Sequence, residues 1–299
     1  MGIRVNPDMY SVILSGLQTN AQQEDQALQQ VSSGQKLNSL SDDPAAAATL
    51  VTLRMQSSSN TQYLQNISSL TAPLNVADSA LSSVVEALTS VESLGVEGAS
   101  GTVNSSNQQA LAQQVQAIQQ QIMGLANTTY NGEYLFSGTA ATTQPYATDA
   151  NAPSGVTYSG NNSSNSVEIS EGQAMPTSLP GSQLFSNATT NVFQSLQDLC
   201  TALNSNSNIP AATAEVQSAL NYVSTQQTFY GNSVDRLNSA QTFLTSEQTQ
   251  LTETESNTLD VNMAKAVTDL SQAETTQQAL VQAGAKISQV NLFDYLPTQ

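Results

Sequence analysis

The last forty residues of the chain carry apolar side chains at alternating steps of four and three positions. Such spacing averages 3.5 residues and keeps one narrow stripe facing a partner helix, which is the pattern of a coiled coil. Little else in this segment is apolar enough to form a core. The stripe consists of Leu259, Met263, Ala266, Leu270, Ala273, Gln277, Leu280, Gly284, Ile287 and Asn291.

The first thirty residues repeat this spacing, with Glu24 as the one residue that does not fit. Their stripe consists of Tyr10, Leu14, Leu17, Ala21, Leu28 and Val31. We call the two stripes together the assembly seam. Two thin stripes at opposite ends of one chain predict that these ends pack on each other or against other subunits, and the pattern leaves both alternatives open.

A heptad register runs without a break from Leu53 to Val91 and continues in phase across Pro73. An interior proline kinks or breaks a helix, so the unbroken register predicts one kinked helix rather than two. Its start is marked by Asp43 as N-cap and by Pro44 at the first helical position, where the missing N–H has no cost.

Turn and strand signals interrupt the helical pattern between residue 128 and about residue 190, where prolines, glycines and asparagines gather. Short runs there, at 132–138 and 155–160, predict a small β-rich insert. Striped helices are expected at 111–125 and 190–203, followed by a long one from about 216 to 251. After that, the register slips by one residue, which predicts a joint within 252–258.

Helices of matching kind lie before and after the insert, so both ends of the chain are expected to build one rod. The predicted fold is mainly α: a long coiled-coil-like helical rod formed by both chain ends, with a small β-rich insert. The predicted domains are a terminal coiled-coil domain (1–42 plus 256–299), a helical rod domain (43–130 plus 190–255) and the insert (131–189).

The assembly seam is too narrow to hold both termini in shape without help. It buries little apolar surface, whereas ordering the roughly fifty residues of the two terminal helices costs backbone and side-chain entropy at every position. We therefore expect the termini to be largely disordered in the free monomer. They would fold in an assembly, where neighbouring subunits add buried area.

Charge and composition exclude several classes of function. A net charge of −17, with only six Lys and Arg, works against nucleic acid and anionic membranes as partners. The chain has no histidine, hence no His-based triad and no His-ligated zinc. The acidic pair Asp42 and Asp43 is explained by the helix cap. No catalytic, cofactor-binding or metal-binding residue is predicted, and the chain is not expected to be an enzyme.

Two further observations concern the compartment. Cys200, the single cysteine, falls on a helical face with Phe193, Leu196 and Leu203, which predicts a buried, inert thiol. No run of eighteen apolar residues and no secretory signal occur. By these signals alone the chain would be cytoplasmic.

Several runs resemble the bacterial flagellin superfamily. The run QVSSGQKLNS at 30–39, with DDPAA at 42–46, Leu53-Arg54 and QNI at 65–67, is similar to the amino-terminal signature of that family. The run GNSVDRL at 231–237 and the segment from DVNMA at 260–264 to Leu270 are similar to its carboxy-terminal half. Within the superfamily, GEYLFSG at 132–138 and LFDYL at 292–296 resemble the hook–filament junction branch.

The resemblance implies a structural role and a different location. A protein of this branch would self-assemble into a layer between hook-associated protein 1 and the flagellin filament. It would be exported unfolded by the flagellar type III system without signal cleavage, guided by an export chaperone, and would end up extracellular in the flagellum. The alternatives are a minor flagellin that forms the filament itself, an enzyme carried in the insert, and a secreted coiled-coil translocator.

Overall fold

The computed structural model describes residues 7–39, 41–100 and 103–293, with side chains between residues 11 and 286. The chain falls into two compact units. Unit 1 combines Met1–Ser58 with Gln248–Gln299, and unit 2 is Ser59–Glu247. The three-part division predicted from the sequence is finer than this and stays a prediction.

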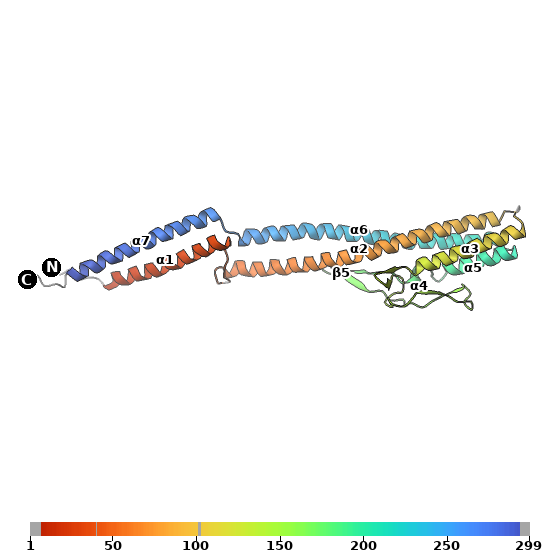
Figure 1. The fold of residues 1–299 in the computed structure, drawn as a ribbon, viewed down its shortest axis with the longest axis horizontal. Helices are drawn as coiled ribbons and strands as arrows, with labels where there is room; N and C mark the ends of the chain where they lie inside the picture. The colour runs from red at the N-terminus through yellow and green to blue at the C-terminus, as the bar shows by residue number, and fades with distance from the viewer. Residues whose placement is uncertain (1–6, 40, 101–102, 294–299) are drawn as a thin grey trace, which may run out of the picture. The chain divides into compact units, whose positions relative to one another are not determined.

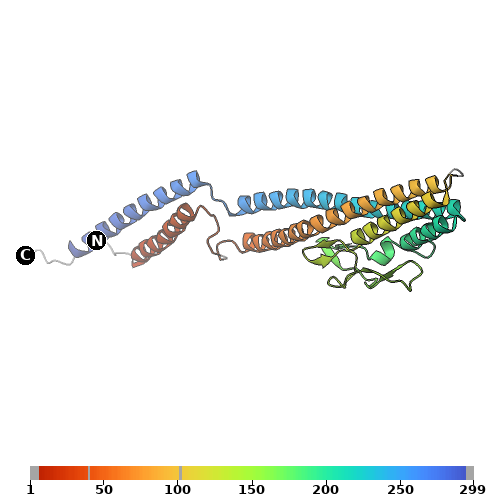
Figure 2. The same ribbon diagram turned by 45° about the vertical axis from the view of Figure 1, so that its right-hand side comes forward.

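Helices make up most of the described chain, as the sequence predicts (Figures 1 and 2). The long ones are α1 (Pro7–Ser33), α2 (Pro44–Gly98), α3 (Ser105–Ala126), α5 (Val192–Ser205), α6 (Ile209–Leu259) and α7 (Met263–Phe293), and a short helix, α4, spans Gly181–Leu184. In unit 2, α2 and α6 run side by side, with α3 and α5 beside them (Figure 1).

Helix α2 begins where the sequence predicts. The Asp43 carboxylate accepts hydrogen bonds from the backbone N–H groups of Ala45 and Ala46, both at 3.1 Å, so Asp43 is the N-cap. The helix then continues through Pro73 without interruption. The prediction of one helix rather than two is confirmed.

The joint predicted within 252–258 is wrong in position. Helix α6 runs through this polar stretch and ends at Leu259, because its Thr, Glu and Gln side chains do not prevent helix formation. The chain leaves the helix at 260–262, where Asn262 caps α7 by accepting a hydrogen bond from the Lys265 N–H at 3.1 Å. The one-residue slip therefore changes the buried face of a continuous helix.

The core of unit 2 includes heptad residues of three helices, all of them nearly or fully inaccessible to solvent, together with residues of α5 and of the insert. Helix α2 supplies Ile67, Leu70, Leu74, Ala77, Leu81, Val84, Leu88 and Val91; α3 supplies Leu111, Val115 and Ile122; α6 supplies Val216, Val223, Tyr230, Leu237 and Leu244. The large apolar residues of the predicted rod stripe are therefore core.

The β-rich insert consists of three antiparallel hairpins, as expected for a small insert. Their strands are β1 (Thr129–Tyr130) with β2 (Glu133–Tyr134), β3 (Tyr146–Thr148) with β4 (Val156–Tyr158), and β5 (Ser166–Ser170) with β6 (Gln173–Pro176). An aromatic cluster joins the insert to α5, because Tyr146 lies 4.9 Å from Phe193 and 5.5 Å from Phe185 between ring centroids. The insert thus shares its core with the helices of unit 2.

Cys200 is buried, as predicted, against the backbone carbonyl of Ala112. Burial raises the pKa of its thiol to about 11. A thiol protonated at neutral pH is a poor nucleophile, so Cys200 acts as a small apolar residue of the core.

Candidate assembly interface

Helices α1 and α7 pack antiparallel on each other within unit 1 (Figures 1 and 2). Ile13 lies opposite Gly284, Gly16 opposite Leu280, and Asn20 opposite Ala273. A Cβ on Gly16 would lie only 3.8 Å from Leu280, so the two helices approach closely there. The two terminal segments therefore pair within one chain.

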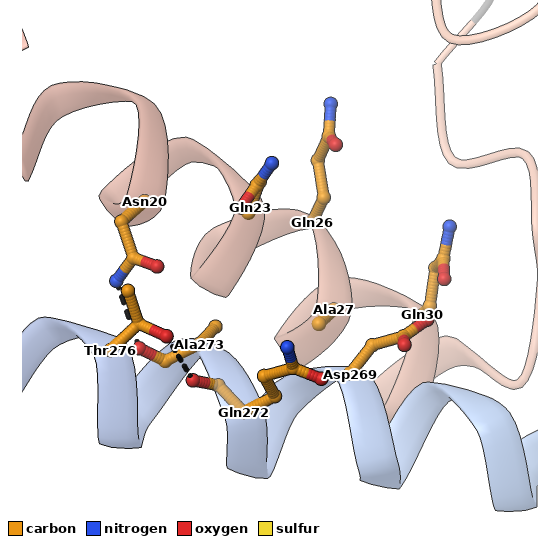
Figure 3. Close-up of a pocket in the computed structure, with 9 residues that line it drawn as sticks. All are labelled: Asn20, Gln23, Gln26, Ala27, Gln30, Asp269, Gln272, Ala273 and Thr276. Atoms are coloured by element: carbon orange, nitrogen blue, oxygen red, sulfur yellow. Dashed lines mark hydrogen bonds between the residues drawn. The ribbon is translucent and has the colours of Figure 1, made fainter. Parts of the chain in front are cut away.

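Small and polar residues form the centre of this contact. The buried residues of α1 and α7, among side chains that the structure describes, are Asn20, Ala27, Ala266 and Ala273. Asn20 is 5% exposed, and its Nδ2 donates to the Ala273 carbonyl at 2.8 Å (Figure 3). The same Nδ2 donates to Gln277 Oε1 at 3.2 Å. Alanine at intervals of seven residues allows close approach but buries little apolar area.

The carboxy-terminal half of the assembly seam lies mostly in or beside this contact. Ala266 and Ala273 are buried, Leu270 and Leu280 are half-buried, and Leu259 is buried at the end of α6. Met263 is 46% exposed and lies outside the contact. Ile287 lies outside the residues with described side chains.

The amino-terminal half differs from the predicted pairing by one position. Leu17, Ala21 and Val31 are half-buried, but Leu14 and Leu28 are exposed. The contact is made instead by the residues that directly precede Leu14 and Leu28, which are Ile13 and Ala27. Tyr10 lies outside the residues with described side chains.

Leu14 and Leu28 have counterparts on α7. Each follows a contact residue directly, as Val267 follows Ala266 and Val281 follows Leu280. One position turns a helix by about 100° in a fixed sense, and antiparallel helices viewed from one end turn in opposite senses. These four residues therefore emerge on the same side of the pair.

We call this side the apolar side; it consists of Leu14, Leu28, Val267 and Val281. Their exposed fractions are 45%, 54%, 50% and 55%. Leu14 lies near the level of Val281, and Leu28 near that of Val267. Two exposed apolar pairs, about 21 Å apart along the helices at 1.5 Å per residue, mark a surface that is suited to contact with another helix.

The opposite side of the pair is polar and carries an open groove of about 430 Å³. Figure 3 shows Asn20 pointing across to α7, while Gln23 and Gln26 extend away from it. Gln272 and Thr276 line the groove from α7. The groove lining offers amides, a hydroxyl and the carboxylate of Asp269, and Val12, which is 64% exposed, is the one exposed large apolar residue described on this side.

The turns next to the pair are tied together inside unit 1. The Lys36 N–H donates to the Leu259 carbonyl at 2.6 Å, and the Val261 N–H donates to the Gly34 carbonyl at 3.1 Å. Gly34 has a φ of 71°, a conformation that glycine adopts without strain. This tie fixes the relative register of α1 and α7 at one end.

The sequence pattern missed Asn20 and Ala27. Their signal was present, since Ile13, Asn20 and Ala27 recur every seven residues. A search for large apolar residues selects the stripe of Leu14 and Leu28, one position away. The antiparallel contact instead uses the stripe of Asn20 and Ala27, whose smaller side chains allow the helices to approach closely.

The part of the chain that the structure describes also bears on other functional classes. There, no three His, Cys, Asp or Glu side chains gather as they would around a metal ion. Within the same residues, no helix has the length and apolar character needed to cross a membrane.

Comparison with known families identifies the class of protein. Residues 6–141 match the bacterial flagellin N-terminal helical region, and residues 213–296 match the bacterial flagellin C-terminal helical region. Together these two matches cover most of the chain and leave residues 142–212, which hold most of the insert, unmatched. The chain belongs to the bacterial flagellin family.

Within that family, the chain is similar to flagellar hook-associated protein 3 of Salmonella typhimurium, with 32% identity over 185 residues. The match covers 61% of this chain and 56% of the relative, so the chain spans a little over half the length of this curated relative. Flagellin B of Helicobacter pylori is 26% identical over 141 residues, which are 46% of this chain and 27% of that protein.

A solved structure has the same fold. The flagellar junction protein FlgL from Legionella pneumophila aligns with a TM-score of 0.60, covering 72% of this chain and 100% of that one. The sequences are 13% identical, so this likeness concerns the fold alone.

Proposed function

We propose that this chain is a structural junction subunit of the bacterial flagellum, which adapts the hook to the flagellin filament. On the hook side it would meet hook-associated protein 1, and on the other side flagellin. It would act by assembly and not as an enzyme. The resemblance to hook-associated protein 3 in the parts that match supports this role.

The apolar side of the α1–α7 pair is the observation that carries the proposal. In a subunit that functions alone, the large apolar residues of such a pair would be buried between the helices. The burial of the small residues would matter little for stability. Here Ala27, Ala266 and Ala273 are buried, while Leu28 and Val267 are exposed. Neighbouring subunits would cover the apolar side and supply the buried area that the pair lacks by itself.

The same surface suits export in an unfolded state. A helix pair with a small core opens at a low cost in free energy, which would favour its passage through the flagellar type III system. Before export, a chaperone would cover the α7 stripe. The subunit would then fold outside the cell, where copies meet at the end of the growing structure.

Labelled antibody on purified hook–basal bodies tests the location. We expect labelling in a band at the distal end of the hook. Labelling along the filament would contradict the junction role and would favour the alternative of a minor flagellin. A strain without this chain should export flagellin into the medium without building a filament.

Two acidic substitutions at one level of the pair test the interface. Leu28→Asp or Val267→Asp places a charge on the apolar side and should reduce incorporation into hook–basal bodies at least about tenfold, which corresponds to about 1.4 kcal/mol. Gln26→Asp, on the polar side and two positions from Leu28, is the matched control and should incorporate normally. Export of each variant is measured in the medium of cells that lack hooks, so that a loss of export is separated from a loss of assembly.

A further inference from the structure

A second candidate surface lies on unit 2, apart from the terminal helices. It is an open groove of about 720 Å³ between the hairpin of β5 and β6 and helix α6. Buried Ile169 contributes from the hairpin, and Arg236, Ala240 and Phe243 contribute from α6. Phe243 is 64% exposed, so the groove offers one large uncovered aromatic ring.

Arg236 gives this groove a charge that nothing else in unit 2 has. Residues 59–247 contain twelve Asp and Glu but only one basic residue, which is Arg236. Among the described residues, the one ion pair is that of Arg54 with Glu255 in unit 1. Arg236 therefore has no carboxylate partner among the described residues. Asp235 also lines the groove, but adjacent residues of a helix point in different directions. The groove is therefore suited to an occupant with both an apolar side chain and a carboxylate.

One other place on unit 2 has the complementary character. Val96, in the last turn of α2, is 62% exposed and is the only other exposed large apolar residue described in this unit. Glu97 follows it and is exposed, and Glu92 lies one helical turn earlier on the same face. The end of α2 thus presents an apolar side chain with the Glu92 carboxylate on the same face and the Glu97 carboxylate on the neighbouring one.

These two places cannot meet within one copy. Gly95 of α2 lies against Thr213 of α6, where a Cβ on the glycine would clash with the threonine hydroxyl. Phe243 lies thirty positions further along α6, which is about 45 Å at 1.5 Å per residue. The occupant of the groove must therefore come from another molecule.

We propose that the groove at Arg236 and Phe243 binds the Val96 end of helix α2 of a second copy of this chain. Val96 packs on the Phe243 ring, and the Glu97 carboxylate pairs with the Arg236 guanidinium. Different surfaces of the two copies meet in this contact, so it extends from copy to copy around or along an assembly. The inference rests on the proposed self-assembly and adds the surface of unit 2 through which copies recognise each other.

A disulfide experiment in cells tests this contact in the full chain. Copies with Val96→Cys and copies with Phe243→Cys are expressed together, and purified hook–basal bodies are analysed without reducing agent. The native Cys200 is buried and does not interfere. We expect dimers that join the two variants at severalfold the yield of dimers within either variant. Thr89→Cys with Thr228→Cys, two exposed positions on the same helices, is the matched control pair and should give a low yield.

Charge reversal separates recognition from mere proximity. Arg236→Glu, introduced into the Phe243→Cys copies, should reduce the joined dimer at least about fivefold, and Glu97→Arg in the Val96→Cys copies should restore it. Equal yields for the test and control pairs, or a joined dimer that is insensitive to both reversals, would overturn the inference. The amount of chain in the hook–basal bodies after reduction reports the proposed function separately: a normal amount without the joined dimer rejects only the groove.

Discussion

Unit 1 and unit 2 are both built mainly of helices but bury different residues. In unit 2 many of the fully buried side chains are large, among them Tyr230, Phe136, Ile67 and Leu81. In the α1–α7 pair of unit 1 the buried apolar residues with described side chains are all alanine. Unit 2 therefore has a core that stabilises it from within, whereas the terminal pair buries none of its described large apolar residues fully and leaves Leu14, Leu28, Val267 and Val281 exposed.

The difference shows that a coiled-coil pattern alone does not tell where a stripe is buried. In unit 2 the stripe residues pack on other helices of the same chain. In unit 1 the exposed stripe flanks a narrow contact and offers area to neighbouring molecules. Burial of apolar surface stabilises by about 25 cal/mol per Å², so the stability of unit 1 depends on what covers this side.

The largest expected effect is a difference in local stability within the free chain. Limited proteolysis of a dilute monomer should cut within α1 and α7 first and leave a resistant fragment that contains most of residues 59–247. By hydrogen exchange, amides around Leu88 should be protected at least about 10³-fold more than those around Ala27, because local opening ranges from near zero to the global free energy of unfolding. Terminal helices as resistant as unit 2 would refute the comparison and the assembly mechanism with it.

The next effect concerns the same substitution in the two units. Leu88→Ala removes a fully buried side chain of unit 2 and should lower the free energy of unfolding by about 2–5 kcal/mol. Leu28→Ala removes an exposed side chain of unit 1 and should change it by less than about 0.5 kcal/mol in the free chain. Urea unfolding of each variant measures both values. A large loss for Leu28→Ala in the monomer would mean that the apolar side is already covered.

Cysteine reactivity compares the two units through a substitution that disturbs the structure less. Burial raises the pKa of Cys200 to about 11, so at pH 8 its thiolate should be roughly a hundredfold scarcer than that of an ordinary thiol. A Leu28→Cys thiol should be alkylated at the ordinary rate, and Cys200 far more slowly until urea unfolds unit 2. The raised pKa also means that Cys200 contributes stability below its ordinary pKa, which is lost as the pH rises through about 11. Equal alkylation rates in the folded chain would contradict the burial.

Much of unit 2 could be predicted from the sequence. The heptad stripe from Ile67 to Val91 is buried as expected, because large apolar residues at regular spacing form one helix face, which packs against the other helices of the unit. Asp43 followed by Pro44 fixed the start of α2 through local chemistry. Cys200 was predicted to be buried from its helical neighbours.

The interface in unit 1 was harder to predict for a physical reason. Its contact uses Asn20 and Ala27, which hydropathy does not select, and leaves out Leu14 and Leu28, which hydropathy does. A period of 3.5 residues does not distinguish a contact stripe from the stripe one position away. The joint was also misplaced, because α6 continues through the polar stretch to Leu259 and the next helix starts at the Asn262 cap, not at a change in polarity.

Asn20 gives the smallest expected effect and the sharpest comparison between free and assembled chain. Asn20→Ala removes the donor to the Ala273 carbonyl and to Gln277, which should cost about 1 kcal/mol where α1 and α7 are paired. Because we expect the pair to be open in the dilute monomer, urea unfolding of the free variant should match that of the unchanged chain. In purified hook–basal bodies, the variant should be released at a temperature a few degrees lower, and Thr19→Ala, an exposed neighbour, should show no shift. A loss of about 1 kcal/mol already present in the monomer would show that the pair forms before assembly. Unit 1 would then be stable without neighbours, as unit 2 is.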